Sequence, residues 1–315
     1  MKDEHWVLVG LFRRIVPIGT FDDSCFFLLL DGFVKIEVTN INEVFNMKDL
    51  ICGRRRFIKR SVIGALGVGL FNNTLISEVK ADELALAKPI RDRVNNSGKL
   101  NVGIYLYPNM TMLDAYAPLQ VLALQPSMNT FTFSKEKVAL PCDAKIQLLP
   151  DYGFSDCPEI DILIVPGAAN PSEQMKDSDV ISFLKKAGEK AKYITSVCTG
   201  SLILAETGLL DGYKTTTHWA YAEALNAYPK VSFVDERVVI DRNRVSGGGI
   251  TSGLDFAFSL IAEVVDEEQA KAAELLLEYN PQPLFNSGDH HTADPILKNN
   301  IQNKIYGLAS DLFNR

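Results

Sequence analysis

Short apolar runs alternate with longer amphipathic segments from residue 100 to the end of the chain. The short runs have the β-rich character of strands, and an Asp-Arg-Asn turn signal marks a hairpin. Strands are predicted at residues 102–107, 130–133, 161–165, 193–197 and 231–233, with the hairpin at 237–245 turning at 241–243. Run 161–165 is continuously apolar and ends at Pro166-Gly167, which is typical of a strand in the middle of a parallel sheet.

The longer segments carry the helical period of apolar positions. Helices are predicted at residues 112–124 with a break at Pro118, at 180–190, from 200 to near Gly208, at 250–265 and at 267–277. Beyond Pro281 we expect a tail along the surface with a last helix at 296–312. This alternation predicts one α/β domain over residues 98–315, a flavodoxin-like sandwich with a mostly parallel sheet between two layers of helices.

The first 87 residues have a different pattern. Segment 53–59, GRRRFIK, matches the twin-arginine export signal, and the uncharged run 61–71 and two small-residue cleavage patterns follow it. We therefore predict a signal peptide at residues 47–87, with export to the periplasm; without use of the signal the protein would stay in the cytoplasm. Residues 1–46 show no sustained helical or strand period, so we interpret them as an extension from a misassigned start or as a disordered segment, with Met47 as the true start.

Composition narrows the class of protein and of partner. The chain has 315 residues, 47% hydrophobic and 23% charged, as expected of a globular protein. Residues 1–81 hold 11 basic and 9 acidic side chains and the remainder holds 21 and 30, and this acidic body argues against nucleic acid as a partner. No apolar run reaches 18 residues, which excludes a multi-span membrane protein and predicts no stable membrane insertion once the signal is removed.

Five cysteines are present, and Cys25 and Cys52 fall in the segments before the predicted domain. In an oxidising compartment Cys142 and Cys157 could pair and leave Cys198 free, and two unpaired thiols are an equal alternative. We find no Cys/His cluster with metal-ligand spacing and expect neither metal nor cofactor. The run Asp289-His290-His291 is a weak metal signal, which we interpret as a solvated loop.

Cys198 lies where a predicted strand meets a predicted helix with almost no loop between them. A helix N-terminus favours a thiolate, so this position suits a nucleophile; the alternative is a small buried hydrophobic residue. Asp114 and Pro166-Gly167-Ala168 also follow strands. Because ligands bind at the carboxyl ends of parallel strands, we expect these groups to converge on one crevice.

The residues around these positions resemble the ThiJ/PfpI family of the class I glutamine amidotransferase-like superfamily, and within it the isonitrile hydratases. The resemblance covers about residues 100–290. It depends on the motifs at 113–114, 165–167, 195–201, 208–212, 216–219, 246–256 and 277–283. It implies a nucleophile elbow at Cys198 and a homodimer.

The resemblance also implies roles for the neighbouring residues. Asp114 becomes the acidic partner of Cys198, with a simple helix cap as its alternative role. Thr199 stands where the peptidase-like members have His. The N–H groups of Ala168 and Thr199, beside Gly167, become donors to a developing negative charge, although Ala168 replaces a second family glycine and could narrow the pocket or strain a turn.

Three further residues complete the expected pocket, and they lie beyond the nucleophile in the chain. They are His218, Gly249 and Ile250. For His218 we keep open the alternative of a helix-start residue that is hydrogen-bonded to backbone.

These expectations favour a cysteine-dependent, cofactor-independent hydratase that turns an isonitrile into an N-formamide through a thioimidate. Asp114 would have a raised pKa beside the thiolate, and the two would titrate as a coupled pair. The alternatives are a hydratase or glyoxalase-like enzyme for reactive aldehydes, and a non-enzymatic ligand or redox sensor related to the sensory domain of AraC-like regulators. An exported chain that ends at Arg315 without space for a helix-turn-helix pair makes a DNA-binding regulator the poorer interpretation.

The signal prediction has a direct test. Sequencing the N-terminus of the exported protein should give a mature chain that begins after Ala81 or Ala87, because the two cleavage patterns end there. A mature product that begins before Met47 would contradict both the signal and the proposed start.

Overall fold

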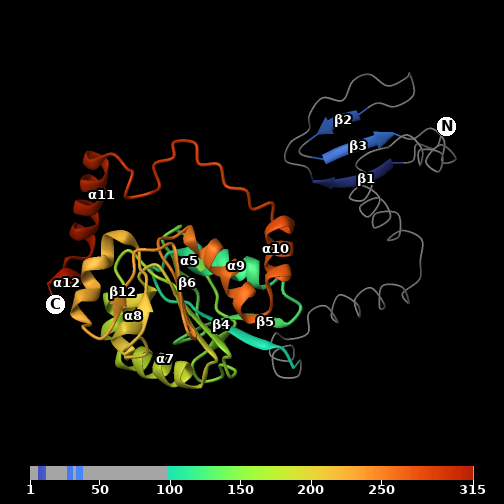
Figure 1. Ribbon diagram of the computed structural model, residues 1–315. Helices are drawn as coiled ribbons and strands as arrows, with labels where there is room; N and C mark the ends of the chain where they lie inside the picture. Colours follow the sequence, from blue (N-terminus) through green and yellow to red (C-terminus); the bar gives the residue numbers. More distant parts are fainter. Residues whose placement is uncertain (1–5, 12–26, 31–32, 38–97, 315) are drawn as a thin grey trace, which may run out of the picture. The chain divides into compact units, whose positions relative to one another are not determined.

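The structure, a computed structural model, describes residues 6–11, 27–30, 33–37 and 98–314. The chain divides into two units, Met1–Ala87 and Lys88–Arg315, and we describe each by itself (Figure 1). The predicted signal at 47–87, Cys25 and Cys52 lie outside the described residues, so the export route and the start at Met47 stay predictions.

The first unit contains an antiparallel sheet where the sequence pattern suggested no regular structure. Its strands, in spatial order, are β1 (Trp6–Leu11), β3 (Phe33–Glu37) and β2 (Phe27–Leu30). The expectation of no strand period in residues 1–46 is therefore wrong. A usable signal was present: β2 and β3 pair with Leu30 opposite Phe33, and the sequence between them, Asp31-Gly32, is a common hairpin dipeptide.

The second unit is built on a seven-stranded sheet with the predicted α/β architecture. All neighbouring strands are parallel except β13, which pairs antiparallel with β14. The spatial order is β13 (Val238–Asp241), β14 (Arg244–Gly247), β10 (Tyr193–Val197), β9 (Ile162–Val165), β4 (Leu100–Tyr105), β5 (Met128–Ser134) and β8 (Tyr152–Gly153). Strand β9 lies at the centre, as its continuous apolar run predicts, and all four of its side chains are buried.

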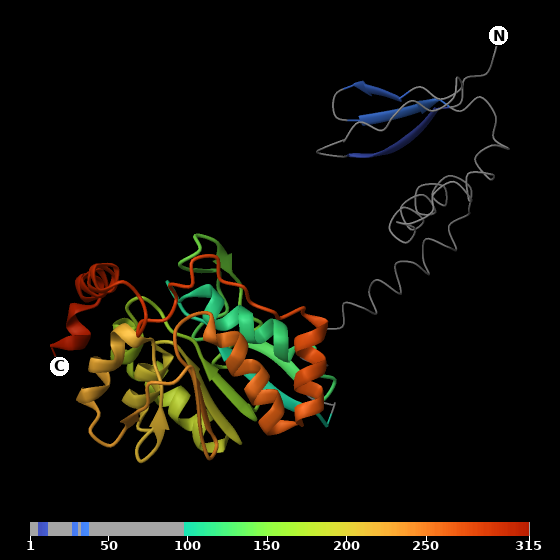
Figure 2. The ribbon, with the colours of Figure 1, turned by 45° about the horizontal axis from the view of Figure 1, so that its top comes forward.

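Helices cover both faces of this sheet (Figures 1 and 2). One group packs together as α5 (Met112–Leu122), α9 (Ser252–Val264) and α10 (Glu267–Leu276). The other comprises α6 (Ser172–Lys176), α7 (Ser178–Lys190) and α8 (Gly200–Thr207). Among the described residues no helix is both long and apolar enough to cross a bilayer.

Smaller elements complete the unit, and several of them carry no strong sequence period. They are the pairs β6 (Leu140–Pro141) with β7 (Gln147–Leu148) and β11 (Lys214–Thr215) with β12 (Ser232–Phe233), and the 3₁₀ helix η1 (Trp219–Ala227). Residues 277–294 form an extended segment without helix or strand, which leads to α11 (Pro295–Leu308) and α12 (Ser310–Phe313). The predicted last helix is thus two helices.

The expected break at Pro118 is wrong, because α5 continues through this residue. Proline removes the hydrogen bond to the carbonyl four residues earlier and costs about 3 kcal/mol in a helix interior. Burial compensates here: Ala117, Pro118 and Val121 are all buried. The Pro118 ring lies close to α9 at Gly253, where an added Cβ would lie 3.4 Å from Pro118 Cδ.

Strands β9 and β10 and helix α8 meet at the carboxyl edge of the sheet in a contact that excludes any side chain. A Cβ on Gly200, the first residue of α8, would lie 1.9 Å from the carbonyl oxygen of Val165 at the end of β9. Real atoms never approach so closely, so only glycine lets α8 start directly after β10. This contact sets the position of everything between the two elements.

The Gly200 contact predicts a large effect for a single methyl group. Gly200→Ala should lower the free energy of unfolding by about 3 kcal/mol or more, because the methyl would meet fixed backbone atoms. The same substitution at Gly307 on α11, where nothing lies within 4 Å, should be neutral or stabilising by about 0.5–1 kcal/mol. Urea denaturation followed by circular dichroism measures both, and equal effects at the two positions would contradict this account.

Candidate active site

Cys198 forms a strained turn between β10 and α8, as predicted for a nucleophile elbow. Its φ is +58°, in the left-handed region that non-glycine residues rarely adopt. The Cys198 N–H donates to the carbonyl oxygens of Gly247 and Gly248, at 3.0 and 2.8 Å, just beyond β14. Such strain costs about 1–3 kcal/mol, persists only where surrounding contacts enforce it, and is concentrated at functional sites.

Thr199, the next residue, joins the elbow to the loop after β9. Its Oγ1 donates to the carbonyl oxygen of Ala168 at 2.7 Å and accepts the Ala168 N–H at 2.8 Å. The expectation that the Ala168 N–H is free for a substrate charge is therefore wrong, because Thr199 already binds it. The expected strain at Ala168 is also missing, since Ala168 is not among the described residues with positive φ.

Asp114 is completely buried in the first turn of α5. Its Oδ2 accepts the N–H of Gly167 at 3.0 Å, so its hydrogen bond goes to the loop after β9 instead of capping its own helix. Its other oxygen, Oδ1, is buried and accepts no N–H or O–H group among the described residues, while a hydrogen bond with the Cys198 thiol links the carboxyl to the elbow. Because Oδ2 accepts the Gly167 N–H, Oδ1 is the oxygen that can carry the proton when the carboxyl is protonated.

Gly167 allows the carboxyl and the elbow to share one small space. A Cβ at this position would lie 2.5 Å from the backbone nitrogen of Thr199 and 3.0 Å from Asp114 Oδ2. The glycine thus lets Asp114 and the Cys198–Thr199 turn approach the same backbone from two sides. The sequence indicated these residues at separate strand ends, and the structure brings them together.

The thiol and the carboxyl form an electrostatically coupled pair. Burial raises the pKa of Asp114 to about 7, while the hydrogen bonds from the Gly167 N–H and the Cys198 thiol act in the opposite direction. Burial also raises the pKa of the Cys198 thiol, and the Asp114 charge raises it further, while the Thr199 N–H lowers it. The expectation that the helix N-terminus leaves a ready thiolate is therefore wrong for the free site, because burial and the carboxylate outweigh it.

Two tyrosines complete the surroundings of the thiol, and sequence reasoning missed both. Tyr107 donates its hydroxyl to the carbonyl oxygen of Pro166 at 3.0 Å, and Tyr221 donates to that of Ala169. Burial raises the pKa of each phenol, with the charge of Cys198 as a further cause for both. Neither residue stands out in sequence, because a buried aromatic in a strand or helix is usually part of the core.

His218 stands at the start of a helix and is hydrogen-bonded to backbone, which is the alternative role considered for it. Its Nδ1 accepts the N–H of Ala220 at 3.3 Å and caps η1. Burial lowers its pKa to about 4, with the charge of His290 as a smaller cause, so the ring is neutral at pH 7 and carries its proton on Nε2. No described hydrogen bond joins it to Cys198.

The glycine-rich turn before α9 positions this histidine. A Cβ on Gly249 would lie 2.9 Å from His218 Cδ2, so the ring packs directly against the Gly249 backbone. Ile250 is 36% exposed at the surface end of this turn. Its place in a pocket wall stays a prediction.

The remaining cysteines of the second unit, Cys142 and Cys157, are free thiols, so the disulfide considered from the sequence is not formed. Burial, and then the charge of Asp156, raises the pKa of Cys157 to about 12. The Cys157 thiol is therefore unreactive at neutral pH. The coupled pair is therefore the site with the clearest chemistry.

Comparison with known proteins finds a family match within the second unit, over the part of the chain that contains Cys198 and Asp114. The model of the DJ-1/PfpI family matches residues 101–263. An isonitrile hydratase of Pseudomonas putida is 41% identical over 194 residues, which cover 62% of this chain and 85% of that protein. A crystal structure of a ThiJ/PfpI family protein from Pseudomonas syringae superposes with a TM-score of 0.66 at 33% identity, covering 72% of this chain and 94% of that one.

A transcriptional regulator matches more weakly. The HTH-type transcriptional regulator GbdR of Pseudomonas aeruginosa is 27% identical over 202 residues. The chain spans 54% of the length of that regulator. The shared part is thus about half of a larger protein.

The coupling between Asp114 and Cys198 predicts a shift in thiol reactivity. In Asp114→Asn the thiol should ionise at lower pH, because the carboxylate charge that opposes the thiolate is gone. The rate of iodoacetamide alkylation at pH 7, followed by mass spectrometry of the Cys198 peptide, should rise severalfold. Glu268→Gln, which removes an exposed carboxylate from α10, should leave the pH profile unchanged. A profile unchanged or moved to higher pH in Asp114→Asn would refute the coupling.

Proposed function

The chain belongs to the DJ-1/PfpI family, and on that premise we propose that it is a cysteine-dependent hydratase that converts isonitriles to N-formamides. The isonitrile hydratase of Pseudomonas putida supports this choice, since 85% of its length aligns with this chain at 41% identity. The presence of Thr199 directly after the cysteine supports it as well, because that position leaves no imidazole beside the thiol.

One observation carries the proposal: the buried thiol of Cys198 has the carboxyl of Asp114 as its ionisable neighbour. No imidazole is hydrogen-bonded to this thiol among the described residues. A Cys–His pair serves acyl transfer, in which the imidazole protonates a leaving amine. A thiol and a carboxyl that share one proton instead supply a nucleophile and an acid to the same small molecule.

The proton that Asp114 and Cys198 share is given to the substrate and recovered within one turnover. The thiolate of Cys198 attacks the terminal carbon of R–N≡C while Oδ1 of Asp114 gives its proton to that carbon, which forms the thioimidate R–N=CH–S–Cys and a carboxylate. Water then adds to the same carbon, with the carboxylate taking one of its protons and passing it to nitrogen. The adduct R–NH–CH(OH)–S–Cys loses its hydroxyl proton to Asp114, the C–S bond breaks, and R–NH–CHO leaves with the pair restored.

The backbone donors fit this reaction better than acyl transfer. Hydrolysis of an ester or amide passes through an oxyanion that needs free N–H donors. Here the N–H of Gly167 is bound to Asp114, the N–H of Ala168 is bound to Thr199, and the N–H of Thr199 is hydrogen-bonded to the Cys198 sulfur. The first step of isonitrile addition forms no oxyanion and requires a proton for the carbon, and in this proposal the protonated carboxyl of Asp114 supplies it.

Three further parts of the proposal come from the sequence and the family. We propose that the protein acts as a homodimer, that it needs no metal or cofactor for this reaction, and that the exported form works in the periplasm. A regulatory role like that of GbdR is the less favoured alternative, since the chain is 27% identical to that protein and 41% identical to the isonitrile hydratase.

The proposal predicts a defined product. Purified protein with an alkyl isonitrile should release the N-formamide, detected by ¹H NMR, and Cys198→Ala should abolish the reaction because no thioimidate can form. Asp114→Asn should lower kcat/KM by about 10²-fold or more, the usual effect of losing a general acid. Wild-type protein that is inert towards several isonitriles but consumes methylglyoxal would replace this function with aldehyde hydration.

The pH profile separates the acid role of Asp114 from a structural one. Below about pH 7 both groups of the pair are protonated, so kcat/KM should fall as the pH decreases through the pKa of Asp114. In Asp114→Asn turnover should fall although the thiol ionises more readily. If turnover rises together with thiol reactivity, the carboxyl is not the acid.

A further inference from the structure

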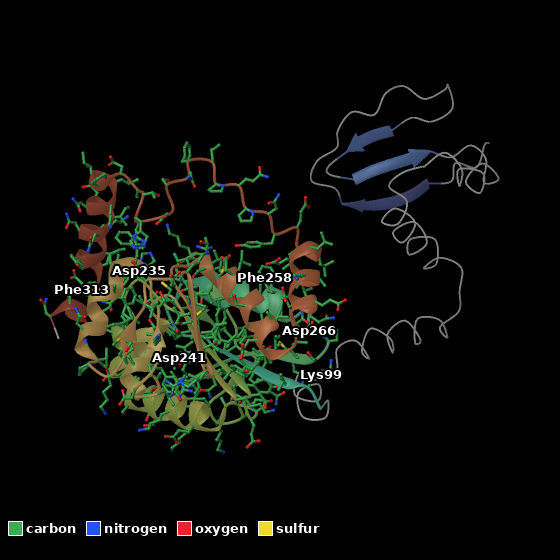
Figure 3. The ribbon with its side chains drawn as sticks, viewed as in Figure 1. Lys99, Asp235, Asp241, Phe258, Asp266 and Phe313 are labelled. Atoms are coloured by element: carbon green, nitrogen blue, oxygen red, sulfur yellow. The ribbon has the colours of Figure 1, made fainter. Side chains whose placement is uncertain are left out.

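Two histidines and one aspartate form a cluster that, among the described residues, shares no hydrogen bond with the Cys198–Asp114 pair. The Nε2 atoms of His290 and His291 lie 3.2 and 3.3 Å from the same oxygen, Oδ2 of Asp235. The three ligand atoms all lie within 4.8 Å of one another. Asp235 follows β12, whereas the histidines belong to the extended segment before α11, which passes beside it (Figure 3).

These spacings fit the edges of a metal coordination sphere. Zinc–imidazole and zinc–carboxylate bonds are about 2.0–2.2 Å long, so neighbouring ligand atoms around a tetrahedral ion are about 3.3 Å apart. Two of the three edges have this length before any ion is added. The third edge, between the two imidazole nitrogens, is no longer than 4.8 Å, and the ring centroids are 4.0 Å apart.

The donor set selects the class of ion. Imidazole nitrogen favours Zn²⁺, Cu²⁺ and Ni²⁺ over Mg²⁺ and Ca²⁺, which prefer oxygen ligands. The site also reaches solvent, since the side chains of Asp235, His290 and His291 are 44%, 20% and 61% exposed. An ion held by these three residues would therefore keep one or more positions for water.

We propose that Asp235, His290 and His291 form a binding site for a divalent transition metal, with Zn²⁺ as the favoured ion, which fastens the extended C-terminal segment to the domain. Sequence alone pointed to Asp289 as the carboxylate beside the histidines. In the structure Asp289 accepts the backbone N–H of His291 instead, and Asp235, 55 residues before His290, supplies the third ligand.

The site connects to the rim of the active site through stacked rings. His290 stacks on Trp219, with ring centroids 5.5 Å apart and planes 5° apart, and Trp219 stacks on His218 at 5.6 Å. His218 in turn packs against Gly249 in the turn that follows the acceptors of the Cys198 N–H. A metal that fixes His290 would therefore hold this stack, and with it η1, in one arrangement.

Metal binding to the full chain tests the proposal. After treatment with a chelator and its removal, isothermal titration with Zn²⁺ should give one site per chain. Asp235→Asn and His291→Ala should each weaken binding at least tenfold. Glu236→Gln, which removes the adjacent exposed carboxylate outside the cluster, should bind Zn²⁺ like the wild type. Because Asp235 and His291 are largely exposed, both variants should keep the circular dichroism spectrum of the wild type.

A second measurement tests whether the metal holds the extended C-terminal segment against the domain. Zn²⁺ should slow proteolytic cleavage within residues 277–290 severalfold in the wild type and in Glu236→Gln, and should have no effect on cleavage in Asp235→Asn. Co²⁺ as a spectroscopic substitute should show ligand-field bands without a thiolate charge-transfer band. Absence of Zn²⁺ binding, equal affinity in all variants, or thiolate ligation of Co²⁺ would each overturn the site.

Discussion

The candidate site depends on one steric constraint, the contact between the first turn of α8 and the end of β9. Gly200 stands so close to the carbonyl oxygen of Val165 that no side chain can separate them. Only two residues, Cys198 and Thr199, therefore separate the end of β10 from the start of α8, and the backbone of Cys198 takes a positive φ. The bonds of its N–H to Gly247 and Gly248 then stabilise a conformation that the residue would avoid by itself.

The same close packing determines the chemistry of the thiol. Burial disfavours charge on both Cys198 and Asp114, and each negative charge further disfavours the other. Near neutral pH the free pair is best described as holding one proton between two sites, so that a thiolate forms when the carboxyl takes that proton. A nucleophile of this kind stays unreactive until a substrate accepts both the electron pair and the proton.

The positions of three histidines in the structure differ from what the sequence indicated. Sequence reasoning linked His218 to the pocket and assigned His290 and His291 to a solvated loop. In the structure all three belong to one region, because Trp219 stacks between His218 and His290. The region joins η1, the turn at Gly249 and the C-terminal segment, and its groups are distant in sequence.

The sequence by itself determined the architecture and the candidate nucleophile. Alternation of short apolar runs with helical periods fixes the order of strands and helices, because burial on both faces requires such runs. Motif residues at the strand ends gave Cys198, Asp114 and Gly167. Tertiary structure alone decided what those groups do to one another: the N–H of Ala168 is taken by Thr199, burial reverses the expected thiol pKa, and α5 continues through Pro118 because α9 packs against it. Each outcome is a balance between desolvation, packing and hydrogen bonds among residues far apart in the chain, and local sequence carries no record of that balance.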